Sequence, residues 1–112
     1  MHRHAFLSAA CALLALAATS AQAAVPCQAQ ALEDARKLLA FHRDNDPRVE
    51  VQANSVQQLP DLANPVDKRQ HYRVVQVMGS IYKADYRMRL IYHHTAGICL
   101  LMGQEVLELS QP

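Results

Sequence analysis

The amino-acid sequence predicts an α+β fold, in which one N-terminal helix packs on an antiparallel sheet of about four strands and one disulfide staples the two together. Residues 86–92 alternate large apolar and long basic side chains, which is the period of a half-buried strand. Residues 27–42 place apolar side chains three and four positions apart, which is typical of an amphipathic helix. Cys27 and Cys99 are the cysteines predicted to form this disulfide.

The first 23 residues have the features of a secretory signal peptide. Met1–His4 is a short basic start, Ala5–Ala18 is an apolar run, and Ala21–Ala23 reads Ala-Gln-Ala, a cleavage signal. The apolar run is shorter than the ~20 residues of a membrane-spanning helix. We therefore expect cleavage after residue 23, removal of Cys11 with the signal, and a periplasmic or secreted protein with no integral membrane segment.

Removal of residues 1–23 from the 112-residue chain leaves 89 residues, so residues 24–112 form a single small α+β domain. An even pair of cysteines in an exported protein favours an intramolecular disulfide. It would close a loop of about seventy residues and raise the free energy of unfolding by up to ~4 kcal/mol. Two buried thiols and an intermolecular bridge are the alternatives. Ten basic and ten acidic side chains remain after Arg3 is removed, so we expect no nucleic-acid partner.

The helix of residues 27–42 carries acidic side chains early and basic side chains late, an order that complements its dipole. Residues 44–47 end it, because Pro47 cannot continue a helix. Residues 48–59 form the first predicted strand, with a bulge near residues 54–55 where the alternation changes phase. Residues 60–68 contain two prolines and no period, and are predicted to be a loop.

Residues 70–78 form the second predicted strand, and Gly79-Ser80 indicates a bulge or a turn after it. Residues 81–92 form either one long strand or a hairpin whose connection lies at residues 82–85. A clearer turn falls at Thr95-Ala96-Gly97. The last strand begins at Ile98, and Gly103 breaks its phase.

The helix needs an apolar surface, and the sheet supplies one. We expect one row of strand side chains under one row of helix side chains: Tyr86, Met88, Leu90 and Tyr92 under Leu32, Ala35, Leu38 and Leu39. Cys27 at the start of the helix would then reach Cys99 at the start of the last strand.

This order of elements resembles the cystatin-like superfamily, in which a sheet wraps around one helix. The resemblance is carried by the helix with Ala31-Leu32 and Ala35 and by the strands with residues 75–79 and 86–90. Cystatins inhibit cysteine proteases through a Q-x-V-x-G hairpin. Residues 76–79, Gln-Val-Met-Gly, are one residue short of that motif, and the chain has no Trp. The resemblance therefore implies a fold and no inhibitor residues.

No motif for catalysis or for a cofactor is present, and we expect neither an enzyme nor a bound cofactor. His93 and His94 are adjacent on a strand, so they point to opposite faces and cannot both ligate one metal ion. A disulfide would remove Cys27 and Cys99 as nucleophiles. We therefore predict no catalytic residues and no metal site.

The remaining candidate is the sheet face that points away from the helix. It either is an ordinary solvated surface or forms a basic-aromatic patch that binds a protein partner. The residues predicted for this patch are Arg73, Tyr82, Lys83, Arg87, Arg89 and His93.

The favoured function is an exported cell-envelope binding module that acts by stoichiometric protein–protein contact, as an inhibitor, an immunity-type protein or an assembly accessory. The alternative is a small apolar-ligand-binding protein with a pocket between helix and sheet, lined by Met78, Met88 and Met102. An open sheet also has free edges, so a homodimer formed by edge-strand pairing is a further possibility.

Overall fold

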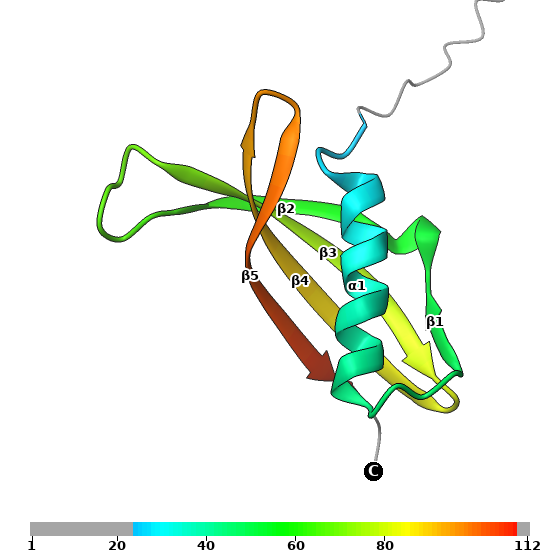
Figure 1. Ribbon diagram of the computed structural model, residues 1–112. Coiled ribbons are helices and arrows are strands. Elements are labelled where there is room, and N and C mark those ends of the chain that lie inside the picture. The colour runs from blue at the N-terminus through cyan, green and yellow to red at the C-terminus, as the bar shows by residue number, and fades with distance from the viewer. Residues whose placement is uncertain (1–23, 110–112) are drawn as a thin grey trace, which may run out of the picture.

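The computed structural model describes residues 24–109 and confirms the α+β fold. One helix lies across one face of a five-stranded antiparallel sheet (Figure 1). The elements in chain order are α1 (Gln28–His42), β1 (Val49–Val51), the 3₁₀ turn η1 (Ala53–Ser55), β2 (Gln57–Ala63), β3 (His71–Ile81), β4 (Ala84–Thr95) and β5 (Ile98–Glu108). The sheet therefore has five strands where the sequence predicted about four.

The helix α1 forms where the sequence predicts it. Its buried stripe is made of Ala31, Ala35, Leu38 and Leu39. It begins directly after Cys27 and ends at His42, where Asp44 and Asn45 take positive φ angles of 52° and 58°. Asp and Asn tolerate this conformation better than most residues, and Pro47 follows, so the chain leaves the helix axis here.

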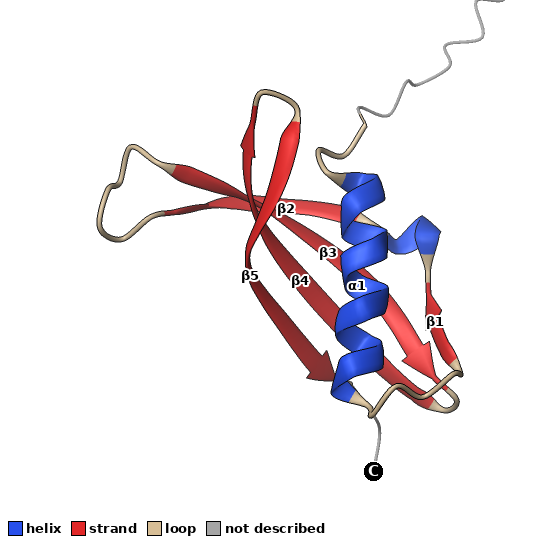
Figure 2. Cartoon of the chain, in the orientation of Figure 1, coloured by secondary structure: helices blue, strands red, loops and turns tan. Residues whose placement is uncertain are grey.

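β1 and β2 share one edge of β3, where the sequence predicted a single bulged strand over residues 48–59. β1 pairs with the end of β3, and β2 pairs with its beginning. Between them the chain leaves the sheet for the single turn η1, drawn in blue between the two strands in Figure 2. The Ser55 hydroxyl bridges the gap, because it donates to Gln52 O (2.6 Å) and accepts from Met78 N (2.8 Å).

The predicted loop of residues 60–68 is wrong at its start, because β2 continues through Pro60 to Ala63. A proline is tolerated here because the register shifts between Leu59 and Leu62, and β2 is an edge strand. The connection to β3 is consequently shorter. Asn64 closes it with two hydrogen bonds to Gln70, one through the backbone and one through the side chains, each 2.8 Å long.

β3 and β4 form a hairpin, which settles the alternative that the sequence left open. Ile81 pairs with Ala84, and the two residues between them, Tyr82 and Lys83, make the turn. Gly79 and Ser80 lie within β3, so the predicted bulge or turn at this point is wrong.

Gly79 marks a close approach of α1 and β1 to the sheet instead of a turn. A Cβ atom built on it would lie 2.9 Å from the Glu50 carbonyl oxygen, 2.9 Å from Met88 Cε and 3.0 Å from Leu39 Cδ2. These distances are too short for a Cβ, so only glycine lets the three neighbours meet at this point.

The hairpin between β4 and β5 turns at Ala96 and Gly97, as predicted, with φ angles of 50° and 75°. The predicted break near Gly103 is also confirmed. Ile91 pairs with Gly103 and Tyr92 pairs with Leu101, so Met102 is an extra residue that forms a bulge.

The row of Tyr86, Met88, Leu90 and Tyr92 is fully buried against the helix stripe, as the alternation predicted. The Tyr92 hydroxyl donates to Asp34 Oδ2 on α1 at 2.7 Å, and Asp34 also accepts from Gln30 Nε2 at 3.0 Å. Burial, and the hydrogen bond to Asp34, raise the pKa of Tyr92 far above its usual range. This hydrogen bond joins α1 to β4.

Cys27 and Cys99 form the predicted disulfide, with their Cα atoms 5.8 Å apart. The bond joins the start of α1 to the start of β5, and the two cysteines are 72 positions apart in the sequence. A disulfide is consistent with a non-cytoplasmic, oxidising compartment. The predicted signal peptide and its cleavage site lie outside the described residues. Within the described residues, no helix is long and apolar enough to span a membrane.

The sheet forks at one end. The pairing of β3 with β4 stops at Arg73 and Tyr92, whereas β2–β3 pairing continues to His71 and β4–β5 pairing continues to Thr95. Two hairpin arms therefore diverge beyond this point, the β2–β3 arm and the β4–β5 arm (Figure 1).

The close approach at Gly79 predicts that adding one methyl group at this position destabilises the protein. We expect Gly79→Ala to lower the free energy of unfolding by about 1–3 kcal/mol, because backbone and side-chain neighbours must both move. The matched control is Gly103→Ala, whose Cβ would meet only the Ile91 side chain at 3.3 Å, and we expect a loss below ~1 kcal/mol. Urea denaturation measures both; equal losses would contradict the packing described here.

The disulfide predicts a second change in stability. We expect the double variant Cys27→Ser, Cys99→Ser to lose about 2–4 kcal/mol of unfolding free energy, because the unfolded chain gains the freedom of a long open loop. The same urea titration with and without reductant on the native protein checks the assignment. A native protein whose unfolding midpoint does not respond to reductant would rule this role out.

Candidate functional site

The candidate site is the sheet face opposite α1, which we call the outer face. Strand register aligns one apolar row across it, because Leu59 pairs with Val74, Val74 with Ile91, and Ile91 with Gly103. Alternation along β4 places this row on the side away from the buried tyrosines. The outer face therefore has an apolar centre that no helix of the described chain covers (Figure 2).

A groove of about 390 Å³ lies on the outer face where the two arms diverge. We call it the apolar groove; its lining residues are Leu59, Pro60, Leu62, Val74, Arg89, Ile91 and Glu105. Leu59, Pro60 and Leu62 come from β2, and Val74 and Ile91 come from the central strands β3 and β4. The register irregularity of β2 thus shapes one side of the groove.

Further apolar side chains are exposed on the neighbouring β4–β5 arm and along β5. Leu100, opposite His93, is 57% exposed, and Leu107, opposite Arg87, is 47% exposed. The Met102 side chain at the bulge is 53% exposed. By register, Leu100 and Leu107 share the outer face with the apolar groove, and exposed apolar surface of this kind marks interaction sites.

Arg87 and Arg89 lie on the outer face, where the sequence placed them, and Arg89 lines the groove. Arg89 pairs in register with Glu105, and Arg87 pairs with Leu107. Neither arginine forms an ion pair with a described residue, and the Nε atoms of both are buried without a hydrogen-bond partner. Both residues are half-buried, so part of each long side chain packs on the sheet and part reaches the surface.

Of the other four predicted patch residues, only His93 shares the outer face of β4 with this pair. Arg73 is opposite Tyr92, on the α1 side of the sheet, and forms an ion pair with Asp61 at 3.4 Å. His93 is half-buried on the outer face beside Tyr72, with ring centroids 6.4 Å apart. Tyr82 and Lys83 form the β3–β4 turn at the far end of the sheet. The face is consequently an apolar surface with two arginines, where the sequence predicted a basic-aromatic patch.

A separate group of charges surrounds the β3–β4 turn. The Arg48 guanidinium lies 5.2 Å from the Tyr82 ring centroid, and Lys83 Nζ lies 5.4 Å from it. Arg48 also holds Asp46 in a two-point ion pair, with nitrogen–oxygen distances of 3.0 and 2.8 Å. Hydrogen bonds from Arg48 lower the pKa of Asp46 to about 2.

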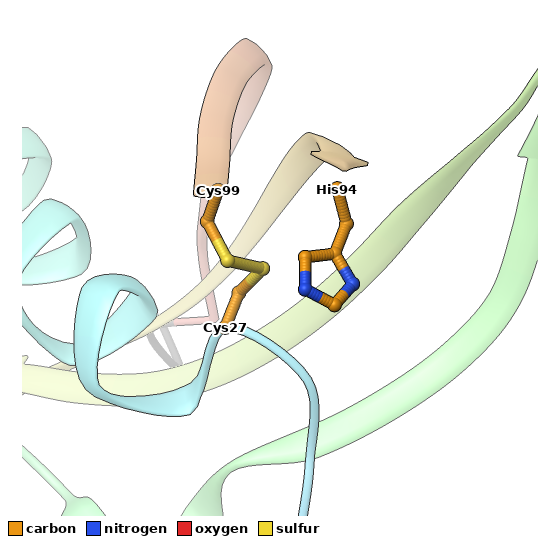
Figure 3. Close-up of side chains that lie close together, drawn as sticks. All are labelled: Cys27, His94 and Cys99. Atoms are coloured by element: carbon orange, nitrogen blue, oxygen red, sulfur yellow. A yellow bond between two sulfur atoms is a disulfide. The ribbon is translucent and has the colours of Figure 1, made fainter. Parts of the chain in front are cut away.

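One cluster of potential metal-ligand side chains is described: Cys27, His94 and Cys99 (Figure 3). Their ligand atoms all lie within 4.8 Å of one another. His94 points to the α1 side and His93 to the outer face, so the two histidines are separated as predicted. In the disulfide the two sulfur atoms are bonded to each other, so neither is a thiolate.

Sequence reasoning missed the β2 contribution to the groove. The first predicted strand ended at Leu59, and the prolines at positions 60 and 65 indicated a loop, so Pro60 and Leu62 were not considered as candidates. No apolar alternation runs through residues 57–63, because the register shifts between Leu59 and Leu62, so the sequence held no clear signal for this part of the strand.

The comparisons with known proteins leave family membership open. No family model matches the chain, and no curated protein and no solved structure shows significant similarity to it. The resemblance to the cystatin-like superfamily therefore stays a prediction, and the functional argument rests on the chain's own residues.

The Asp46–Arg48 pair makes a pH-dependent prediction. The pKa of Asp46 is lower in the folded chain than in the unfolded chain, so its interaction stabilises the fold above about pH 4 and is lost as the pH falls toward 2. We expect a carboxyl NMR titration of Asp46 with a midpoint near 2, and a return toward the ordinary value in Arg48→Gln. An unchanged midpoint in that variant would assign the shift to another cause.

Proposed function

We propose that this protein is a non-enzymatic binding module whose outer face binds a protein segment with apolar and acidic side chains. The observation that carries the proposal is the apolar groove, which no described helix covers: Arg89 lines it and Arg87 lies two positions away on the same face of β4, and neither cation has an ion-pair partner among the described residues. The groove supplies the contact area and the arginines select the charge of the partner.

The apolar component supplies the affinity. Leu59 and Ile91 are partly exposed in the groove, and Leu62 is 48% exposed at its edge. Covering such surface is favourable by roughly 25 cal/mol per Å² before the costs of association. An apolar side chain of a partner would fill the groove, while the exposed leucines on β5 extend the contact beyond it.

The arginine pair supplies direction and charge preference. A carboxylate that reaches Arg87 or Arg89 forms charge-assisted hydrogen bonds, which are stronger than neutral ones, and Arg is enriched at protein interfaces. The apolar surface beneath the guanidinium groups lowers the local dielectric and strengthens this attraction. Glu105 at the groove disfavours a second carboxylate next to Arg89, so the acidic group is expected nearer Arg87.

The setting of this contact is the bacterial cell envelope or the extracellular space, as proposed from the signal sequence and the disulfide. A stoichiometric binder of this kind acts as an inhibitor, an immunity-type protein or an assembly accessory. All three roles need only that one face covers a partner surface.

A second candidate is the binding of a small apolar ligand with an anionic head group. Its support is the size of the apolar groove, about 390 Å³, which falls in the range of small-molecule sites. The sequence suggested a pocket between helix and sheet, but Leu39, Met88 and Leu90 fill that space and are fully buried. The ligand site of this second candidate is therefore the groove on the outer face, not a pocket between helix and sheet.

Site-specific photo-cross-linking in the exporting cell tests the main proposal. A photoreactive residue replaces Leu62 at the groove in one variant and Phe41, which is 82% exposed on α1, in the control. We expect a protein adduct of one defined mass at Leu62 and none at Phe41. Charge reversal by Arg87→Glu with Arg89→Glu should remove the adduct, because it replaces the attraction for an acidic partner with repulsion.

The charge-matched control is Lys37→Glu with Arg43→Glu on the helix side, which leaves the outer face intact. An adduct that survives reversal of the Arg87–Arg89 pair, or that is lost equally in the control, contradicts the proposal. Native mass spectrometry of the purified exported protein separates the second candidate, since a retained small mass displaced by Ile91→Glu identifies a ligand in the groove.

A further inference from the structure

We propose that Cys27, Cys99 and His94 form a binding site for a thiophilic divalent metal ion such as Zn²⁺ when the disulfide is reduced. The three side chains come from three different segments and converge at one point, the end of the β4–β5 arm against the start of α1 (Figure 3). This site is independent of the outer face, because His94 points to the opposite side of β4 from Arg87 and Arg89.

Two of the ligands are positioned by strand register. His94 is the direct partner of Cys99 in the β4–β5 ladder, and the tight turn at Ala96-Gly97 fixes that pairing. Side chains at such paired positions stand about 4.5–5.5 Å apart at Cβ, which suits two ligands of one ion. Breaking the disulfide leaves this register unchanged.

The third ligand is positioned by the helix. Cys27 immediately precedes α1, and the helix is held on the sheet by Ala31, Ala35 and Leu39, all fully buried. The hydrogen bond from Tyr92 to Asp34 adds a fixed polar contact. These contacts do not involve the disulfide, so Cys27 stays near His94 and Cys99 after reduction.

The donor set and its spacing suit zinc. A tetrahedral ion takes Zn–S bonds of about 2.3 Å and Zn–N bonds of about 2.0 Å, so the two sulfur atoms must separate to roughly 3.7 Å. The Cα atoms of Cys27 and Cys99 are 5.8 Å apart, which allows that separation through side-chain rotation. His94 is exposed, and its ring can turn toward the sulfur atoms.

The site has an open fourth position. The disulfide and His94 face a surface hollow of about 470 Å³, whose lining includes Ala24, Val25, Gln28 and Gly97. None of these side chains is a strong zinc ligand, so water or an exogenous ligand completes the coordination. Three protein ligands and one exchangeable position are the arrangement of zinc sites that interact with a further molecule.

The chemistry balances with a dithiol as reductant. The dithiol gives two electrons and two protons to the Cys27–Cys99 bond, becomes a disulfide itself, and leaves two protein thiols. The metal ion then displaces the two thiol protons and binds both thiolates and the neutral His94 ring. In this scheme the disulfide and the metal ion are alternative cross-links between α1 and the β4–β5 arm.

Cobalt titration of the whole chain tests the site. The protein is reduced with a phosphine, which is converted to its oxide with one water, and Co²⁺ is added as a spectroscopic probe for Zn²⁺. We expect one Co²⁺ per reduced chain, with sulfur-to-metal charge-transfer absorption, displacement by Zn²⁺, and no such absorption in the oxidised protein. His94→Ala should weaken the binding at least tenfold, since loss of a ligand costs no less than loss of a supporting partner.

His93→Ala is the matched control, because it removes the adjacent imidazole from the outer face and should leave the affinity unchanged. Circular dichroism of the reduced variants checks that the fold is retained. Equal affinities for His93→Ala and His94→Ala would show that the cysteines alone hold the ion, as in an unfolded reduced chain, and would overturn the proposal. Absence of Co²⁺ binding by the reduced protein would overturn it as well.

Discussion

The close packing of α1 on the sheet at Gly79 is the contact on which the rest of the structure depends. Leu39 and Met88 approach this backbone from the helix and from β4, and the Glu50 carbonyl approaches it from β1. A single glycine thus brings together the helix, the edge strand and the central strand. The helix covers one face of the sheet, and no helix within residues 24–109 covers the other.

The alternation of β4 then determines where function can reside. Its even-numbered side chains from Tyr86 to Tyr92 are buried in the core. The odd-numbered side chains therefore lie on the opposite, outer face of the sheet: Arg87, Arg89, Ile91 and His93. Ile91 meets Val74 and Leu59 in register, which makes the centre of the outer face apolar. The same strand therefore supplies the core, the floor of the groove and the two arginines beside it.

Local patterns predicted the helix, the β4 alternation, the turn at Ala96-Gly97 and the Gly103 irregularity, because each is decided by neighbouring residues. The alternation located an irregularity of the first strand near residues 54–55, but not its division into two strands, which depends on the Ser55 hydroxyl reaching Met78 across the sheet. For the candidate site, the alternation of β4 predicted that Arg87, Arg89 and His93 share one face. Its apolar centre depends on register between strands, and the place of Tyr82 and Lys83 depends on where the hairpin turns.

The adjacent histidines show how one strand serves two separate sites. His93 lies with Tyr72 on the outer face, whereas His94 lies beside the disulfide on the α1 side, although one peptide bond joins them. The groove is lined by residues of β2, β3, β4 and β5, and neither cysteine of the disulfide is among them. A change of cross-link at Cys27 and Cys99 would therefore alter the β4–β5 arm and the start of α1 while the floor of the groove keeps its shape. The two proposed sites lie on opposite faces of the same sheet. A change at one of them can therefore leave the other unaltered, although both belong to one small domain.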